Sequence, residues 1–561
     1  MHIEKNVCDN ILYTLLNEKS KTKDNLNARK DLQDMGIRRD LWPDDNGKYH
    51  LALYSLTRDA KKVFLATLKN VRVPDGYSSN ISRCIDEAQQ KIIGLKSHDC
   101  HILIEQLLPL AIRNVLPNQV TSVLIEFCSF FRILCGKSLS RTELDKLQDR
   151  IVITLCHLEM LFPPSFFTVM VHLTVHLVEK AKLGGPVHYR YMYPIERKLG
   201  HLKFFVRNKA HPEGSIAEGY LAEESLTFCS WYIDDMETRF NRPSRLCYDP
   251  PYEMSSVLPK LGTPHGGHSN FNLTKIEKLQ AHRYVVYNHE GVKPYINAFR
   301  DHIRRTSKGR RLSPAEIEKK VNKDFVDWFQ ALSVNPDNPY EMSTDIKFLA
   351  RGPMMNARRF SVYDINGYRF RTLTREFGLK TQNSGVFLVS NTPCIASIAD
   401  RNMRQENLPY YGKLEDIIEL NYHGQFAVVL FKCKWADTTR DRGYKKDHWN
   451  FNCVNFDRLI HTGEREEHEP YIEASQAQMV YYVDDMVNKG WSIAVHVKPR
   501  DMYDIGQGNE DIVYENEPYQ EQELEQLFDP NNEYIQLATN LLDSDAIEDN
   551  VATNLARDMF E

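Results

Sequence analysis

The sequence has 561 residues, which is enough for roughly three or four domains at the usual size of about 150 residues each. With 42% hydrophobic and 26% charged residues, its composition is that of an ordinary globular protein. The formal net charge of −5 excludes a protein that binds nucleic acid through a net positive charge. Contact with DNA therefore requires a local basic patch.

Cysteine usage and hydropathy indicate the cellular environment of the protein. The 11 cysteines include no CxxC pair, which indicates reduced thiols in an intracellular protein. The N-terminal residues lack the basic start and apolar run of a signal peptide. The most apolar region, Ile151 to Val178, is interrupted by His157 and by Pro163-Pro164, so we predict no membrane span.

The first half of the chain has a helical periodicity. Met1–Leu16 is predicted as a short helix because Val7, Ile11 and Leu15 share one face, and Asp24–Met35 is predicted as a second. These helices have no obvious partner in their own segment, so we expect their apolar faces to pack against later parts of the chain.

From Ser97 to Tyr232 the pattern is strongly helical. Apolar residues from Val120 to Leu134 keep the i, i+3, i+4 spacing of a core-facing stripe, and Gly136 supplies a C-cap. Pro163-Pro164 separate the next two helices, and Gly184-Gly185 end the second. Capping boxes are predicted at two helix starts, Ser140 with Glu143 and Ser215 with Glu218.

Residues 241–275 are rich in Pro, Gly, Ser and His and are predicted as a linker. A helical segment over residues 276–335 follows, with a third capping box at Ser313 and Glu316. Its candidate DNA-binding residues are Arg300, Arg304, Arg305, Lys308, Arg310 and Arg311. Such a run binds phosphates in a salt-dependent way, and a solvated helix end or a nuclear-import patch explains it equally well.

After about Asp345 the periodicity becomes alternating. Asn366-Gly367 predicts a hairpin, because a type I′ turn needs positive φ at both central positions, and a second turn is predicted at His423-Gly424. Strands are predicted over Asp416–Tyr422, Phe426–Trp435, Gln478–Val483 and Trp491–Val497. We therefore predict a small β barrel or sandwich over residues 340–503, followed by an acidic, largely disordered tail over residues 504–561.

Two histidine motifs have the spacing or density of a metal site. His172 and His176 lie four residues apart, but HLTVH lacks the glutamate base of a zinc protease, which favours core or interface histidines. The motif SHDCH, Ser97–His101, has several zinc-ligand types side by side. Adjacent residues point in different directions, and a helix-start role for Ser97 or Asp99 explains much of the motif. The sequence therefore predicts no metal site.

The segment Gly184–Lys203, GGPVHYRYMYPIERKLGHLK, contains one acid, Glu196, among aromatic and basic residues at a predicted helix start. Together with the opening MHIEKNVCDN, it resembles the plant CACTA (En/Spm) transposase family. Other motifs that carry the resemblance are SHDCH at 97–101, PEGSIAEGY at 212–220, INGYRF at 365–370, KTQNSGV at 380–386, FKCKW at 431–435 and ASQAQMVYYV at 474–483. They occur in the order found in the family.

The resemblance implies a domain organisation. Residues 1–90 are similar to the end of an RNase H-like transposase core with a helical insertion, and residues 91–240 to the helical uncharacterised domain that follows it. Residues 340–503 resemble the family's second, β-rich uncharacterised domain. The expected fold class is therefore multidomain α+β.

The resemblance also implies a chemistry. The full family enzyme cuts DNA with Mg²⁺ or Mn²⁺ held by two aspartates and a third acid on a later helix. Glu196 matches the third acid, and His2 matches an Asp-x-x-His motif whose aspartate would precede Met1. Both core aspartates are missing, and a single carboxylate binds magnesium weakly, so no cofactor is expected in this chain. A helix dipole also favours an acid at the Glu196 position without any metal.

Three hypotheses follow. The first is a truncated, transposon-derived nuclear protein that does not cut DNA alone and binds transposon-end DNA or a full-length transposase. The second is the C-terminal part of a longer, active transposase whose true start lies upstream. The third is a domesticated protein-interaction factor that uses the β domain and the acidic tail. Membranes and small-molecule substrates are not expected partners.

Overall fold

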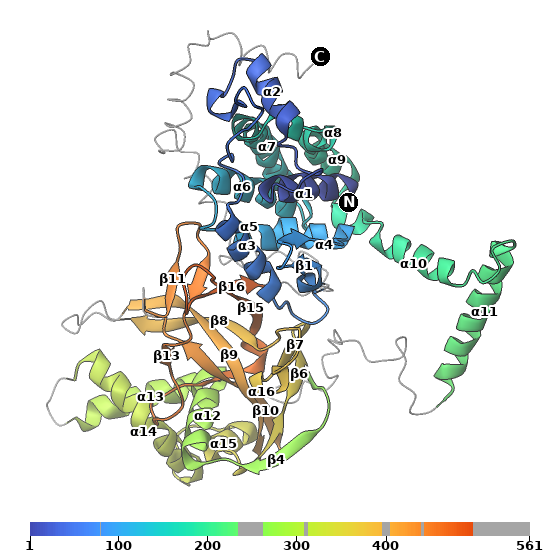
Figure 1. Ribbon diagram of the computed structural model, residues 1–561. Coiled ribbons are helices and arrows are strands. Elements are labelled where there is room, and N and C mark those ends of the chain that lie inside the picture. The colour runs from blue at the N-terminus through green and yellow to red at the C-terminus, as the bar shows by residue number, and fades with distance from the viewer. Residues whose placement is uncertain (79, 234–261, 308–311, 395–403, 439–441, 498–561) are drawn as a thin grey trace.

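The computed structural model describes residues 1–78, 80–233, 262–307, 312–394, 404–438 and 442–497. Within these residues the chain is α+β, with a helical part up to residue 233 and an antiparallel sheet part after residue 262 (Figure 1). The predicted fold class is confirmed at this level. Most of the predicted linker and the predicted acidic tail over residues 504–561 lie outside the described residues.

Helices dominate the first part of the chain. They are α1 (His2–Leu15), α2 (Leu26–Asp34), α3 (Arg58–Asn70), α4 (Ser97–Ile102), α5 (Leu108–Ile112), α6 (Asn118–Leu134), α7 (Arg141–Leu161), α8 (Val169–His172), α9 (Leu177–Gly184), α10 (Tyr193–Phe204) and α11 (Pro212–Trp231). A short ladder of β1 (Ile85–Asp86) and β2 (Lys91–Ile92) lies between α3 and α4. No helix among the described residues is long and apolar enough to cross a bilayer.

The apolar stripes predicted from the sequence are buried. Val7, Ile11 and Leu15 of α1 are fully shielded from solvent, and so is the stripe of α6 from Val120 to Leu134. Burying each such side chain contributes about 1.5–3 kcal/mol before the entropy of ordering is counted. Gly185, with a φ of 74°, follows the end of α9, so the predicted helix stop is confirmed.

The three predicted capping boxes have different outcomes. Ser313 and Glu316 form the reciprocal box, with Glu316 Oε2 accepting from the Ser313 amide at 2.9 Å. Ser140 is the N-cap of α7, but its side chain does not cap an amide. Ser215 lies inside α11, so that prediction is wrong: the helix already starts at Pro212, whose fixed φ suits a first helical position.

The described residues of the second part combine strands with α-helices. The strands are β3 (Thr263–Pro264), β4 (His268–Asn272), β5 (Asn356–Phe360), β6 (Val362–Ile365), β7 (Tyr368–Arg371), β8 (Gly385–Cys394), β9 (Arg404–Tyr422), β10 (Phe426–Ala436), β11 (Tyr444–Lys446), β12 (Asn452–Val454), β13 (Leu459–Ile460), β14 (Tyr471–Glu473), β15 (Gln478–Asp484) and β16 (Ser492–His496). The helices are α12 (Lys275–Asn288), α13 (Lys293–Thr306), α14 (Pro314–Val334), α15 (Thr344–Arg351) and α16 (Leu373–Glu376).

The strands form two antiparallel sheets. The larger follows the order β11-β12-β16-β15-β8-β9-β10-β13, with β14 on β10, β5 on β9 and β4 on β5, and the smaller is β3-β6-β7. The end of the predicted linker therefore contributes strands, since β3 and β4 pair with β6 and β5. Both predicted turns are confirmed: Asn366-Gly367 has φ values of 53° and 74°, and His423-Gly424 has 57° and 78°.

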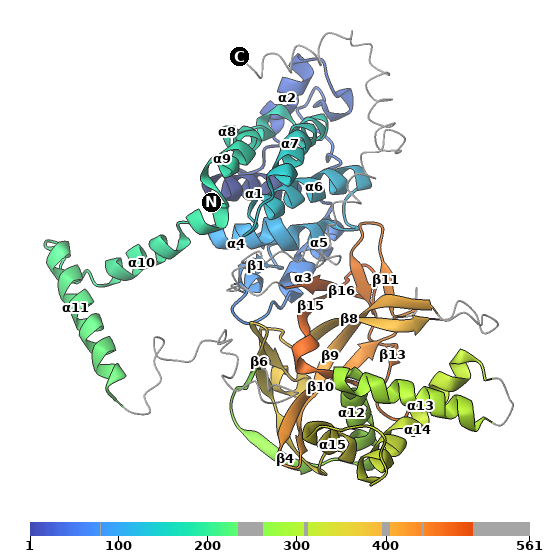
Figure 2. The same ribbon diagram turned by 180° about the vertical axis from the view of Figure 1, so that it is seen from behind.

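The central strand β10 is buried on both faces. Val428 and Leu430 lie in the core shared with α12 to α15, whereas Val429 and Phe431 lie in the core shared with β6, β7 and the helical part. The ring of Phe431 lies 5.1 Å from that of Phe370 on β7, so the two sheets pack across a common core. Helices α12 to α15 gather at the end of the molecule opposite α1 and α2 (Figure 2).

Buried charges join the helical part to the sheet part. Arg113, which follows α5, is 2% exposed and donates to Asp447 at 2.9 Å and also to Asp485. Arg371 on β7 lies 3.1 Å from Asp75 of the helical part. Because one hydrophobic core also runs through both parts, they form one packed unit.

One buried histidine makes the stability of the sheet part pH-dependent. His282 of α12 lies 3.2 Å from the Tyr422 hydroxyl, and burial, assisted by Lys278, lowers its pKa to about 3. The unfolded imidazole has a pKa of about 6.5, so below that pH only the unfolded chain gains the proton. The free energy of unfolding should therefore fall by about 1.4 kcal/mol per pH unit as the pH decreases from about 6.5.

We expect the stability advantage of the wild-type chain over His282→Gln to shrink by about 2 kcal/mol between about pH 7.5 and about pH 5. Urea unfolding at the two pH values measures it. The exposed His302 on α13 supplies the control: His302→Gln removes a surface histidine, so comparing the two variants separates the effect of burial from the mere loss of a histidine. If the difference in the free energy of unfolding between the wild type and His282→Gln is the same at both pH values, this prediction is contradicted.

Candidate functional site

Four side chains from separate helical elements meet in one largely buried cluster. Glu4 comes from α1, His101 from α4 and Cys135 from the end of α6, while Glu105 lies in the π-helical turn Leu103–Leu107. Their oxygen, nitrogen and sulfur atoms all lie within 4.8 Å of one another. In the part of the chain that the structure describes, it is the one group of three or more His, Cys, Asp or Glu side chains with this proximity.

The backbone after Lys96 brings His101 and Glu105 to the same place. Asp99 accepts a hydrogen bond from the Lys96 amide at 3.0 Å, which confirms its predicted role at the helix start. His101 and Glu105 are then four residues apart on one helix face. Pro109 has no amide hydrogen for the Glu105 carbonyl, and the π-helical turn accommodates that missing bond.

Glu4 is carried into the core by the amphipathic helix α1. It lies on the same face as Val7 and Ile11, and its side chain is only 4% exposed. A buried carboxylate without a partner is costly, and His101 provides one, since its Nδ1 lies 2.6 Å from Glu4 Oε1. The acid of the opening HIEKN motif is therefore held by the second histidine of SHDCH.

The same His101 nitrogen also faces the second carboxylate. Nδ1 lies 3.2 Å from Glu105 Oε1, yet a ring nitrogen carries at most one hydrogen. Glu105 Oε1 is buried and accepts no hydrogen bond. The single hydrogen on His101 Nδ1 therefore cannot serve both carboxylates well.

The electrostatics of the cluster reflect two acids in a buried site. Burial, with a smaller contribution from Glu4, raises the pKa of Glu105 to about 7 against the opposing effect of His101. Burial opposes the protonation of His101, but Glu105 and Glu4 outweigh it and raise its pKa. Burial, together with Glu105 and Glu4, raises the pKa of the Cys135 thiol well above its ordinary value. These protons are therefore shared among coupled groups.

Two tyrosines cover the cluster on its outer side. The ring of Tyr191 meets that of His101 edge-on at 5.4 Å, and the ring of Tyr193 meets that of His98 at 5.4 Å. The Tyr191 hydroxyl lies beside the Cys135 thiol, and the buried Tyr193 hydroxyl makes no hydrogen bond. Segment Gly184–Lys203 thus contacts SHDCH through its aromatic residues.

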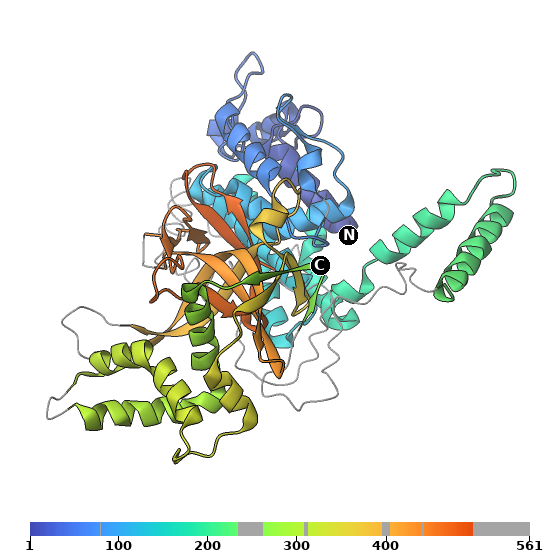
Figure 3. The same ribbon diagram turned by 90° about the horizontal axis from the view of Figure 1, so that it is seen from below.

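At Tyr193 the chain enters an exposed helical arm, which we define as α10 and α11. The arm extends away from the rest of the molecule (Figures 1 and 3). No side chain of α10 is buried, and in α11 only Ser230 is. The two helices contact each other through His201 and Glu223, 2.8 Å apart, and through Phe205, whose ring lies against the Gly219 backbone.

The predicted catalytic residues lie outside the cluster. Glu196 is in the first turn of α10 and is exposed, and no other acid joins it in a ligand group among the described residues. His2 is exposed at the start of α1, with its carbonyl accepting from Asn6 at 2.7 Å. The assignment of both residues to a catalytic motif stays a prediction.

The predicted DNA-binding residues are mostly paired or undescribed. Arg300 makes an ion pair with Glu318 at 2.7 Å, and Arg304 makes one with Asp301 at 2.8 Å. Arg305 is exposed on α13. Lys308, Arg310 and Arg311 lie outside the described residues. Since two of the three described arginines already face carboxylates, the basic run has less free charge than its sequence suggests.

Sequence reasoning missed Glu4, Glu105 and Cys135. Glu4 occupies a position on the buried stripe of α1, and Glu105 follows His101 at i+4, so helical spacing could have revealed both. Cys135 had no comparable signal. His172 and His176, considered as a metal pair, are exposed, with ring centres 5.2 Å apart and no acid or cysteine in a ligand group with them among the described residues.

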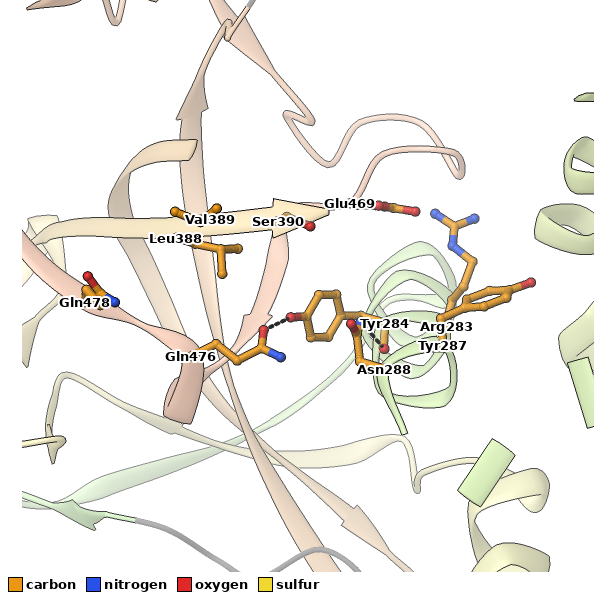
Figure 4. A pocket seen from close by; sticks show the side chains of 10 residues that line it. All are labelled: Arg283, Tyr284, Tyr287, Asn288, Leu388, Val389, Ser390, Glu469, Gln476 and Gln478. Carbon is orange, nitrogen blue, oxygen red and sulfur yellow. Dashed lines mark hydrogen bonds between the residues drawn. The ribbon is translucent and has the colours of Figure 1, made fainter. Parts of the chain in front are cut away.

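A separate pocket of about 530 Å³ lies between α12 and β8 (Figure 4). Its lining is mainly polar: Arg283, Tyr284, Tyr287, Asn288, Leu388, Val389, Ser390, Glu469, Gln476 and Gln478. Tyr284 donates to Gln476 across it, and Arg283 donates to the His468 carbonyl at 3.1 Å. The lining contains no cysteine or histidine, and we assign no reaction to this pocket.

Comparison with known protein families gives two matches. Residues 134–247 match the Domain of unknown function (DUF4218), and residues 418–494 match the Domain of unknown function (DUF4216). Both domains are typical of plant transposase-derived proteins. The first match includes the arm, and the second covers strands from β9 to β16. No curated protein and no solved structure matches the chain.

Proposed function

We propose that this chain is a transposon-derived protein of the CACTA (En/Spm) type that does not cut DNA by itself and acts by association through its arm. The partner is a second copy of the same arm, carried by this chain or by a full-length transposase. The two matching domains support the proposed origin from a transposon. The exposed arm supports the proposed association with a second arm. A nuclear location is part of this proposal, because a transposase-related partner would act on nuclear DNA.

Apolar exposure is the main argument for a partner. Eight large apolar side chains of the arm are exposed: Ile195, Leu199, Phe204, Tyr220, Leu221, Leu226, Phe228 and Trp231. Phe204 is 83% exposed and Leu226 is 71% exposed. If each of these side chains exposes apolar surface on the order of 100 Å², one arm offers roughly 800 Å². That is about the area that one partner buries in a standard protein–protein interface.

Charge identifies the partner as another arm. Helix α10 carries Arg197, Lys198 and Lys203 against Glu196, whereas α11 carries four glutamates and no lysine or arginine. If α10 of one arm packs on α11 of another, a two-fold symmetric pair contains this contact between a basic and an acidic helix twice. A surface of this kind is complementary to itself.

The proposal that the chain does not cut DNA has a direct test. Two-metal cleavage needs several carboxylates around a pair of cations, and Glu196 stands alone and exposed among the described residues. We expect the purified chain with Mg²⁺ or Mn²⁺ to leave DNA with the element's terminal repeats uncut. Cleavage that disappears in Glu196→Gln would overturn the proposal and favour an active transposase.

A further inference from the structure

We propose that Glu4, His101, Glu105 and Cys135 bind one zinc ion. The set offers two carboxylate oxygens, one imidazole nitrogen and one thiolate sulfur within 4.8 Å of one another. Zinc accepts all three ligand types and most often takes four of them in a tetrahedron. Magnesium and calcium prefer oxygen ligands alone, so the histidine and cysteine argue against them.

The hydrogen-bond shortage in the cluster points to a cation at its centre. His101 Nδ1 lies 2.6 Å from one carboxylate and 3.2 Å from the other, and a single hydrogen cannot serve both well. Glu105 Oε1 remains buried without a hydrogen bond. A zinc ion would accept a lone pair from the nitrogen, both carboxylates and the sulfur, and so would satisfy every one of these atoms.

Charge leads to the same conclusion. Two carboxylates and an ionisable thiol surround one imidazole, with Arg132 as a further positive group near Glu105. Buried acids of this density need protonation or a cation. A divalent ion supplies two positive charges and ionises a coordinating thiol outright.

The proposed site would be structural. Four protein ligands leave no open position for a water or a substrate, which is the feature that separates structural from catalytic zinc. The ligands come from α1, α4, the adjoining π-helical turn and the end of α6, and Tyr191 and Tyr193 close the outer side. Zinc would thereby join α1, α4 and the end of α6 and fix the His101 ring on which Tyr191 and Tyr193 rest, whatever the arm itself binds.

Metal analysis and cobalt spectroscopy test the site. The full chain, purified with zinc present, should retain about one zinc per molecule after dialysis. Cobalt(II) exchanged into the site should give the intense visible bands of a tetrahedral ion and a thiolate-to-cobalt charge-transfer band. A chain that holds much less than one zinc and gives only the pale spectrum of six-coordinate cobalt would overturn the inference.

Variants locate the metal. Cys135→Ser should abolish the charge-transfer band, and Glu105→Gln should weaken zinc binding at least 10-fold. The exposed Cys156 supplies the matched control, since Cys156→Ser should keep both the band and the zinc. Zinc content and spectra that are equal in Cys135→Ser and the wild type would place the metal elsewhere and overturn the assignment. Because the wild-type spectrum is itself decisive, a variant that fails to fold does not affect the test.

Discussion

Replacing Arg113 by methionine should lower the free energy of unfolding by about 3–5 kcal/mol, because it leaves two buried carboxylates without their cation. Arg113 is 2% exposed, and its partners Asp447 and Asp485 are 13% and 4% exposed. It is also a buried cation at the joint between the helical part and the sheet part. Urea unfolding followed by tryptophan fluorescence and by far-ultraviolet circular dichroism measures the change.

An exposed ion pair provides the comparison for Arg113. Arg304 lies 2.8 Å from Asp301 on the surface of α13, with the two side chains 62% and 55% exposed. Arg304→Met should change the stability by less than about 1 kcal/mol, since solvent already screens that pair. If Arg113→Met costs no more than Arg304→Met, the joint does not depend on this buried cation.

The second large effect concerns the arm. Phe204→Glu and Leu226→Glu should each raise the dissociation constant of the self-associated chain about 100-fold or more, because a charge would enter an apolar interface. Both side chains are exposed in the single chain, so the substitutions should leave its thermal unfolding unchanged. Sedimentation equilibrium over a range of protein concentrations gives the dissociation constants.

Phe377 is the matched control for the arm variants. It follows α16 in the sheet part and is 91% exposed, so Phe377→Glu alters an equally exposed phenylalanine away from the arm. We expect its dissociation constant to equal that of the wild type. Equal weakening by Phe204→Glu and Phe377→Glu would mean that net charge, not the arm, controls association.

Local rules predicted much of the fold. The apolar stripe of α1, the stop at Gly185 and the positive φ values at Asn366-Gly367 and His423-Gly424 depend on neighbouring residues alone. The pairing of β4 with β5 depends on residues more than 80 positions apart; β4 lies in the predicted linker, and a predicted helical segment over residues 276–335 separates it from β5. Long-range strand partners of this kind leave no periodic signal at either end.

The sequence predicted some parts of the candidate site and not others. SHDCH and Gly184–Lys203 were singled out, and both reach the cluster, through His101 and through Tyr191 and Tyr193. The family motif points to Glu196. It does not point to Glu4, because an acid on the apolar face of a helix predicts a buried site only when its partner is known. That partner lies 97 residues away in the chain.

A charge exchange between arms tests self-association most directly. One variant carries Arg197→Glu and Lys203→Glu, which makes both helices of its arm acidic. The other carries Glu213→Lys, Glu218→Lys and Glu224→Lys, which leaves Glu223 as the acid of α11 and makes that helix basic like α10. In sedimentation velocity each variant alone should be monomeric, while their equimolar mixture should form a heterodimer about as readily as the wild type forms a homodimer. A mixture that stays monomeric, or single variants that dimerise like the wild type, would contradict pairing through α10 and α11.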